Sequence, residues 1–194
     1  MWSAAILAGG RATRFDGRDK STLVVEGRTI LDRQVDELSA FTDDVLVVGG
    51  RTPHRRAALV GDRVPGCGPL GGLHAALSTA QGTAVFVVAC DMPYVTCALA
   101  LHLLDQIDDV DAVVPRTERG VHPLCAAYSR RALDVVARRL AAGQLKMLDL
   151  IAELRTRIVP GDSIDRFGDH RRLLANVNTP GEYAGLEAFQ GHSL

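Results

Sequence analysis

The sequence predicts a doubly wound α/β fold, built as a single domain around a mostly parallel sheet. Short apolar runs rich in β-branched residues alternate with segments that have the spacing of amphipathic helices. The 194 residues, 47% of them hydrophobic, suffice for one sizeable core and are too few for two full domains. We therefore expect one domain over residues 1–194.

The predicted strands are apolar throughout, as strands buried on both faces of a parallel sheet are. They cover residues 4–7, 45–48, 85–89, 112–114 and 124–128. Apolar residues at helical spacing predict helices over residues 30–38, 73–80, 99–107, 132–142, 147–154 and 179–189, the last with Pro180 in its first turn. The polar stretch 161–172 is expected to be a mobile loop, although its apolar Ile164 and Phe167 argue against full disorder.

Composition and charge exclude several classes of protein. The 22 basic and 23 acidic residues leave a formal charge of -1, so nothing draws the whole chain to nucleic acid or to an anionic membrane. The amino terminus lacks the pattern of a signal peptide, and no apolar run is long enough to span a bilayer. Cys67, Cys90, Cys97 and Cys125 have no CxxC spacing, which favours reduced core thiols in a cytoplasmic protein.

Ligands of a parallel α/β sheet collect at the carboxyl ends of its strands, so the segments that follow the predicted strands are the candidate site. Gly9 and Gly10 follow the first strand, and Arg14 lies in the same loop, which suits a backbone cradle for phosphates. Asp91 follows the strand at 85–89, where a cation that bridges phosphates needs a carboxylate. A second glycine-rich loop, 66–72, opens a helix, and such a loop can wrap a base or present amides to an anion.

Each of these features also has a purely structural interpretation. The first loop matches neither GxGxxG nor the P-loop, and a tight turn without a ligand would look the same. Lys20, one of two lysines in the chain, suits a transferring phosphoryl group but is also compatible with a solvated surface position. Asp91 and Asn178 could each cap the helix that follows, and Asp62 could serve a turn. The six histidines form no HExxH motif, and no GxSxG elbow occurs.

Five segments together resemble the molybdenum cofactor guanylyltransferases, the MobA family within the GT-A-like nucleotidyltransferases. They appear in the family's order and span nearly the whole chain. The segments are LAGG with Arg14 and Asp19-Lys20 (7–20), GPLGGL (68–73), CDMP (90–93), HPLCAAY (122–128) and NVNTP (176–180). The resemblance implies a Rossmann-like nucleotide-diphospho-sugar transferase fold and transfer of GMP from GTP to the terminal phosphate of molybdopterin, loaded with molybdenum, with loss of pyrophosphate.

The resemblance also implies which residues bind the nucleotide. Leu7, Ala8 and Gly9 would contact it, and the loop with Gly10 and Arg14 would cradle its triphosphate. Two departures from the family pattern concern this part of the site. Phe15-Asp16 replaces the more usual Met-Gly, and Val48-Gly49-Gly50 stands where members can carry an asparagine that contacts the nucleotide. Base selection is therefore less firmly predicted than phosphate binding.

The remaining implied roles concern chemistry and partners. Lys20 would neutralise charge that develops on phosphate, Asp91 would hold Mg²⁺, Asn178 would join it at the metal or at the acceptor phosphate, and Asp62 would contact the base. Other molybdenum-cofactor assembly proteins and apo-molybdoenzymes are implied as transient partners. Arg116, His122 and Lys146 are candidate contacts for the acceptor, and each is equally compatible with a surface or packing role.

Three alternatives to this function stay open. The chain could be a cytidylyltransferase that acts on the same pterin, or a guanylyltransferase for another phosphorylated acceptor. It could also be a nucleotide-binding subunit that carries out no chemistry, against which the intact Lys20 and Asp91 argue.

Overall fold

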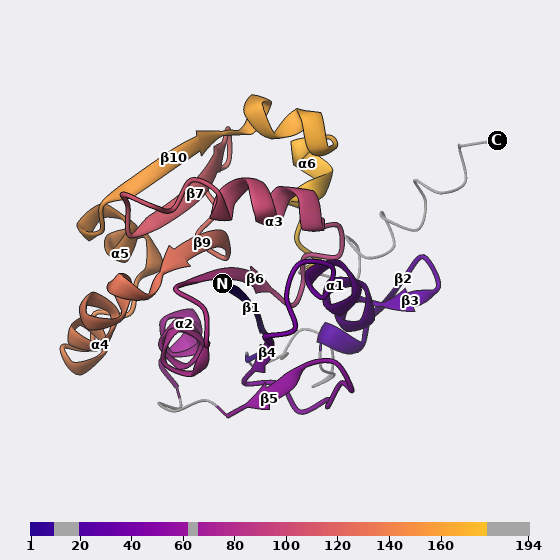
Figure 1. Cartoon of the computed structure of the whole chain (residues 1–194), viewed down its shortest axis with the longest axis horizontal. Coiled ribbons are helices and arrows are strands. Elements are labelled where there is room, and N and C mark those ends of the chain that lie inside the picture. The colour runs from indigo at the N-terminus through magenta and orange to yellow at the C-terminus, as the bar shows by residue number, and fades with distance from the viewer. Residues whose placement is uncertain (10–19, 62–65, 178–194) are drawn as a thin grey trace.

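The computed structural model describes residues 1–9, 20–61 and 66–177, with the side chain of Lys20 outside the described part. A central eight-stranded sheet runs through it in the order β10-β7-β9-β6-β1-β4-β5, with β8 paired to β7 (Figure 1). The strands are β1 (Trp2–Leu7), β4 (Val45–Val48), β5 (Ala58–Val60), β6 (Ala84–Ala89), β7 (Ala112–Thr117), β8 (Gly120–Val121), β9 (Cys125–Ser129) and β10 (Thr156–Pro160). Only β8 and β9 run antiparallel to their neighbours in this sheet, which confirms the mostly parallel plan.

Helices cover both faces of the sheet, as a doubly wound fold requires (Figure 1). Helices α1 and α3 pack on one face, and α2, α4 and α5 pack on the other. The helices are α1 (Ile30–Leu38), α2 (Gly68–Thr79), α3 (Cys97–Leu104), α4 (Leu133–Ala141), α5 (Met147–Glu153) and α6 (His170–Leu173). Shorter elements are the 3₁₀ turns η1 (Lys20–Thr22), η2 (Arg130–Ala132) and η3 (Gly161–Phe167), and a hairpin of β2 (Val24–Val25) and β3 (Arg28–Thr29).

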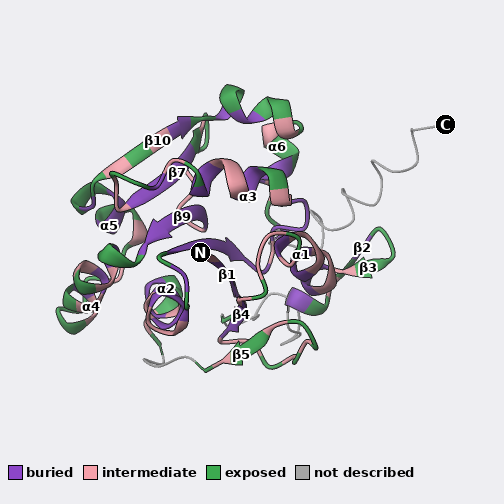
Figure 2. Cartoon of the chain, in the orientation of Figure 1, coloured by how far each residue is buried: buried purple, intermediate pink, exposed green. Residues whose placement is uncertain are grey.

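The central strands divide their side chains between the two faces. In β1, Ala4 and Ile6 enter the core beneath α1 and α3, whereas Ala5 and Leu7 enter the core beneath α2 and α4. Side chains alternate across a strand, so a strand buried on both sides must be apolar at every position. Figure 2 shows β1 and β6 buried along their length. This burial explains why the apolar runs predicted these strands so closely.

Helix α1 has the predicted bounds because its sequence marks both its start and its buried face. Thr29 caps it, and its hydroxyl accepts a hydrogen bond from the Asp32 N–H at 3.0 Å. Its buried positions, which fall at helical spacing, are Ile30, Leu31, Gln34, Val35 and Leu38. Four of these five are apolar, and Gln34 is the exception.

Other elements differ from the prediction. Helix α2 begins at Gly68, five residues before the predicted start, because Pro69 is tolerated in a first turn. Strands β5 and β10 were not predicted, because β5 is only three residues long and β10 begins with the polar Thr156 and Arg157. The predicted mobile loop at 161–172 is wrong: η3 and α6 occupy it, with Ile164 fully buried. The helix predicted at 179–189 lies outside the described residues.

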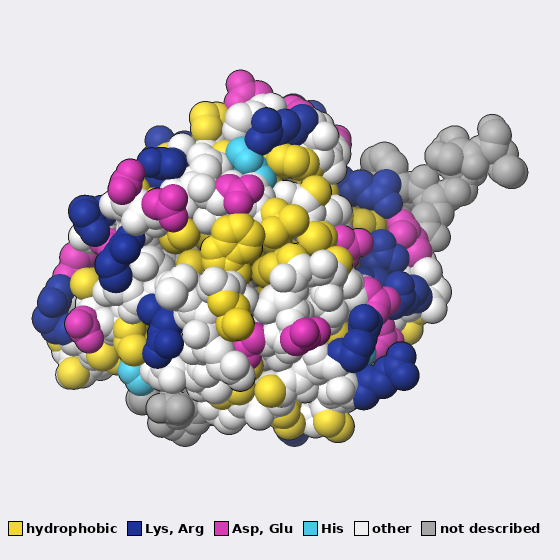
Figure 3. Space-filling model, in the orientation of Figure 1, with side chains coloured by type: hydrophobic (Ala, Val, Ile, Leu, Met, Phe, Trp, Pro, Cys, Tyr) yellow, Lys and Arg dark blue, Asp and Glu magenta, His cyan; other side chains and the backbone are white. Residues whose placement is uncertain are grey.

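In the described part of the chain, no helix has the length and apolar character needed to cross a membrane. None of the four cysteines forms a disulfide, but only Cys90 and Cys125 are core residues, whereas Cys67 and Cys97 are half-buried where α2 and α3 begin. On the face in Figure 3, basic and acidic side chains are interspersed around an apolar centre.

Candidate active site

Three parallel strands end side by side at one edge of the sheet. Leu7, the last residue of β1, is paired with Val48 of β4 on one side and with Ala89 of β6 on the other. The ladder continues past the strand ends, because the Ala8 N–H donates to the Val48 carbonyl at 2.8 Å and the Cys90 N–H donates to the Leu7 carbonyl at 3.1 Å. The segments that follow these three strands therefore leave the sheet at one place.

Two of these segments touch through glycine backbone. Gly49 has a φ of +72°, and a Cβ built on it would lie 2.9 Å from the Cα of Gly9. Gly50 is also tightly packed, since its Cβ would lie 3.0 Å from the Cβ of Ala8. Glycine at both positions lets the β4 loop support the main chain of Ala8 and Gly9 without a side chain between them. The main chain of this loop is thereby held where a phosphate could approach it.

The amino terminus of α2 faces the same edge. A Cβ on Gly72 would lie 3.3 Å from Leu7 Cδ2, so glycine allows the first turns of α2 to approach the end of β1. Cys67, at the N-cap position, makes no side-chain capping hydrogen bond, and the first turn contains no acidic residue. Uncapped amides and the positive end of the helix dipole favour an anion at this position.

Asp91 lies directly beyond β6, in a turn that main-chain hydrogen bonds close. The Met92 N–H donates to the Ala89 carbonyl at 3.2 Å, and the Val177 N–H donates to the Asp91 carbonyl at 2.8 Å. Helix α3 is capped by Thr96, whose hydroxyl accepts from the Leu99 N–H. The half-buried Asp91 is therefore not the cap of the following helix.

A small third core joins the chain segments that carry the predicted catalytic residues. Its buried members are Val25, Ile30, Tyr94 and Val177, and the partly buried Leu23 packs against them. In the sequence these residues lie close after Lys20, close after Asp91 and directly before Asn178. The cluster therefore brings three distant parts of the chain to the same side of the site.

A carboxylate bridge covers this small core. Glu26 accepts from the Tyr94 hydroxyl at 3.4 Å and pairs with Arg33 at 3.1 Å and Arg172 at 2.8 Å. The Tyr94 ring lies beneath both guanidinium groups, with centroid distances of 4.3 Å to Arg172 and 5.6 Å to Arg33. Burial, followed by the charge of Glu26, raises the pKa of Tyr94, so its hydroxyl stays protonated and donates. The sequence offered no motif for this bridge, whose members lie up to 146 residues apart.

Only part of the predicted site can be placed. Leu7, Ala8, Gly9 and Asp91 come together at the carboxyl edge, as predicted. The backbone of Lys20 begins η1, but its side chain lies outside the described part. The other predicted residues also lie outside it: Gly10, Arg14, Asp16, Asp62 and Asn178. Their roles stay predictions.

The candidate acceptor contacts are placed but not equally suited to an anion. His122 is part-buried, with its Nε2 2.9 Å from the Thr117 hydroxyl. Burial, with Arg119 next in importance, lowers the pKa of His122, which makes it a neutral hydrogen-bonding group near neutral pH. Arg116 ends the pairing of β7 with β8, and Lys146 precedes α5; both are exposed.

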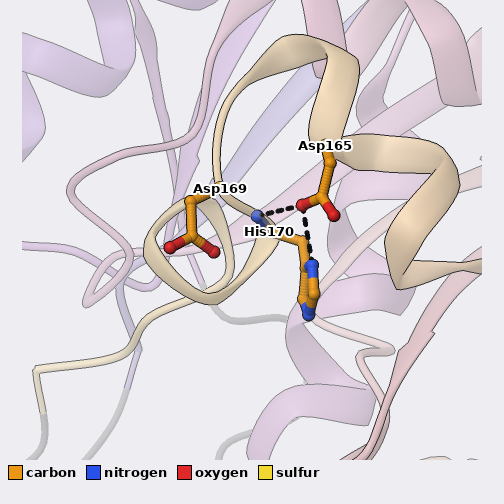
Figure 4. Close-up of side chains that lie close together, drawn as sticks. All are labelled: Asp165, Asp169 and His170. Atoms are coloured by element: carbon orange, nitrogen blue, oxygen red, sulfur yellow. Dashed lines mark hydrogen bonds and ion pairs between the residues drawn. The ribbon is translucent and has the colours of Figure 1, made fainter.

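Within the described residues, one cluster has the composition of a metal site, formed by Asp165, Asp169 and His170 (Figure 4). Its groups already serve local structure. Asp165 accepts from both the N–H and the Nδ1 of His170, at 2.9 and 2.8 Å, and Asp169 caps α6 by accepting from the Arg171 N–H. Glu118 lies 3.6 Å from the other ring nitrogen of His170. This arrangement attaches α6 to the β7–β8 turn and accounts for the cluster without a metal.

Comparisons with known proteins agree with the geometry. The model of the MobA-like NTP transferase domain matches residues 4–157. A molybdenum cofactor guanylyltransferase from Desulfosudis oleivorans is 35% identical over 94% of this chain and 93% of its own length. The crystal structure of molybdopterin-guanine dinucleotide biosynthesis protein A from Archaeoglobus fulgidus matches with a TM-score of 0.84 and 25% identity, over the whole of both chains.

A more distant neighbour shows how widely the fold is used. The 2-C-methyl-D-erythritol 4-phosphate cytidylyltransferase from Thermus thermophilus has a TM-score of 0.70 at 18% identity, over 97% of this chain and 98% of its own. The fold is thus that of a nucleotidyltransferase. Within that class, the chain belongs to the MobA-like NTP transferase family, which confirms the resemblance seen in its motifs.

The contact between Gly9 and Gly49 gives a first test. Gly49→Ala should lower both the free energy of unfolding and the affinity for nucleotide, because a Cβ there displaces the Gly9 backbone. Gly143→Ala is the matched control: Gly143 has a φ of +66° but open space around its Cβ. Both variants should lose about 1–2 kcal/mol to left-handed backbone strain. Urea unfolding and nucleotide titration measure the two effects, and unchanged nucleotide affinity in Gly49→Ala would contradict the supporting role of Gly49.

The His170 cluster predicts a pH-dependent contribution to stability. The hydrogen bond to Asp165 raises the pKa of His170 from its ordinary 6.5, so its contribution is present below that value and is lost as the pH rises through the raised pKa. The pKa values of Asp165 and Glu118 are lowered, chiefly by backbone hydrogen bonds, and their contribution is lost only in acid. His170→Gln should therefore be destabilising at about pH 5.5 and much less so at about pH 8.5.

Urea unfolding of wild type and His170→Gln at both pH values checks this prediction. His102→Gln is the control with the opposite sign, because burial and then Arg166 lower the pKa of His102. An equal stability difference between wild type and His170→Gln at the two pH values would show that the Asp165 contact adds nothing.

Proposed function

We propose that the chain transfers GMP from GTP to the terminal phosphate of molybdopterin, loaded with molybdenum, and so forms molybdopterin guanine dinucleotide. The observation that carries this proposal is the position of Asp91, beyond β6 and next to the loop that Gly9 and Gly49 shape. The relatives described above, the molybdenum cofactor guanylyltransferase from Desulfosudis oleivorans and the molybdopterin-guanine dinucleotide biosynthesis protein A from Archaeoglobus fulgidus, support the same reaction.

The reaction needs positioning more than acid–base chemistry. An oxygen of the acceptor phosphate attacks the α-phosphorus of GTP, the bond from that phosphorus to the bridging oxygen breaks, and pyrophosphate leaves with the bond electrons. The acceptor phosphate is ionised near neutral pH, so no side chain has to remove a proton from it. Catalysis then depends on holding the two phosphates in line and on neutralising their charge.

The described residues fit a magnesium ion at this position. Mg²⁺ is commonly held by one or two carboxylates together with substrate phosphates and water, and Asp91 supplies a half-buried carboxylate at the mouth of the site. The ion would neutralise phosphate charge when bound. Asn178, which follows Val177 in the sequence, is proposed as the second polar group at the metal or at the acceptor phosphate.

The chain's own groups divide the remaining tasks. Main-chain amides of Ala8, Gly9 and Gly10 would contact the triphosphate, assisted by the first turns of α2. The Arg14 and Lys20 side chains would add positive charge, with Lys20 acting on the transferring group. Asp62 is proposed to contact the base.

The loop after β4 does not explain a preference for guanine over cytosine. Gly49 and Gly50 pack against Gly9 and Ala8, and neither has a side chain with which to read a base. Cytidylyl transfer to the same pterin is therefore the alternative that the first experiment must separate.

The product would then pass to other proteins. We place the reaction in the cytoplasm, which cysteines that form no disulfide favour, with other molybdenum-cofactor assembly proteins and apo-molybdoenzymes as transient partners.

The decisive experiment measures pyrophosphate release from GTP and from CTP with Mg²⁺, with and without molybdenum-loaded molybdopterin, together with detection of the dinucleotide. We expect release that requires both GTP and the pterin. Preference for CTP would assign the sister activity. Pyrophosphate release with GTP and a different phosphorylated compound would identify that compound as the acceptor. No release under any condition would favour a nucleotide-binding protein that carries out no chemistry.

Asp91→Asn tests the proposed metal ligand. The amide keeps the shape of the side chain but loses its charge, so kcat should fall at least about 100-fold while the thermal unfolding temperature changes little. The exposed Asp134→Asn in α4 is the control for the loss of one negative charge. Steady-state kinetics and thermal unfolding give the two readouts, and near-normal kcat in a folded Asp91→Asn would remove Asp91 from the metal role.

A further inference from the structure

The buried glutamine of α1 is out of place among its neighbours. Gln34 is 1% exposed and lies on the same stripe of the helix as Leu31, Val35 and Leu38, which enter the apolar core. Helical spacing favours an apolar residue at such a position. A buried amide costs free energy unless hydrogen bonds replace those it made to water. Its partners therefore indicate why a polar residue is needed.

Those partners are the two ends of the turn that carries Asp91. The Nε2 of Gln34 donates to the Ala89 carbonyl at 2.8 Å and to the Met92 carbonyl at 2.9 Å. Two carbonyl acceptors require the amide nitrogen at this position, so the pair of bonds also fixes which way the amide group faces. Cys90 and Asp91 are the two residues between the bonded carbonyls.

A neighbouring residue extends the same attachment. Arg33 Nε donates to the Pro93 carbonyl at 3.2 Å, so α1 contacts three carbonyls within five consecutive residues. Arg33 is itself held by Glu26 at 3.1 Å. The turn after β6 is thus joined to a helix that is packed on the sheet. The geometry of the turn therefore does not depend only on the hydrogen bonds within the turn.

We propose that Gln34 is a positioning residue for the reaction: it does not touch the substrates, and it holds the turn so that the Asp91 carboxylate stays where the metal binds. The inference rests on the proposed function of Asp91. Groups behind metal ligands affect metal affinity because they restrict the ligand's orientation. Loss of Gln34 should therefore change metal dependence and not only stability.

Gln34→Met is the test variant, because methionine has similar length, suits an apolar core and cannot donate. We expect the Mg²⁺ concentration for half-maximal pyrophosphate release to rise at least about tenfold. Leu38→Ala is the control: it removes core packing from the same helix face, and the leucine side chain forms no hydrogen bond to the turn, so it should lower the unfolding temperature and leave the Mg²⁺ dependence unchanged.

A second measurement does not depend on turnover. Amide hydrogen exchange of the 90–93 turn should speed up in Gln34→Met, and it should stay at the wild-type rate in Leu38→Ala when both are compared at equal distance below their unfolding temperatures. Faster exchange with an unchanged Mg²⁺ dependence would overturn the positioning role. Wild-type exchange in the turn of Gln34→Met would overturn the structural premise.

The outcomes separate this inference from the proposed function. If the wild-type protein shows no turnover with any acceptor, Mn²⁺ binding in the presence of GTP, followed by electron paramagnetic resonance, replaces the rate as the metal readout. Weaker Mn²⁺ binding in Gln34→Met than in Leu38→Ala would support the inference even then. Equal binding in the two variants, or no Mn²⁺ binding to wild type, would overturn it.

Discussion

The pairing of β1 with β4 on one side and β6 on the other is the constraint on which the site depends. Leu7 is in register with Val48 and with Ala89, so the three following loops start at the same level. Apart from the partly buried Trp2, the side chains of these three strands are buried between the two helical layers. A shift of one residue would move each side chain to the opposite face, so the apolar packing that stabilises the sheet also aligns the loops.

Two kinds of contact carry this alignment beyond the strand ends. Gly49 lets the β4 loop approach the Gly9 main chain, Gly50 makes room for the Ala8 side chain, and Gly72 lets α2 approach the Leu7 side chain. Polar side chains hold the turn after β6. Gln34 donates to the two carbonyls on either side of Asp91, and Glu26 links Tyr94, which follows the turn, to Arg33 of α1. The end of β1 is thus closely packed because glycines replace larger residues, whereas the turn after β6 is held by side-chain hydrogen bonds.

The sequence predicted features that depend on neighbouring residues better than features that depend on contacts between distant parts of the chain. The strands at 45–48 and 85–89 and the helix at 30–38 were predictable because burial on one or two faces leaves an apolar pattern. The position of Asp91 was predictable because it directly follows a strand. The roles of Gln34 and Glu26 were not. Helical spacing places Gln34 on the buried face of α1, but its partners lie 55 and 58 residues away, and Glu26 depends on Tyr94 and Arg172, 68 and 146 residues away.

A separation between main-chain contacts to phosphates and side-chain contacts to the base explains how one fold can serve different nucleotides and acceptors. Phosphates are common to all the substrates, and main-chain amides at the end of β1 and in the first turns of α2 can bind them whatever side chains surround the site. Gly49 and Gly50 keep side chains away from that edge. Discrimination between bases must therefore come from residues that are not packed into it, which can vary without disturbing the register of the sheet or the turn that holds Asp91.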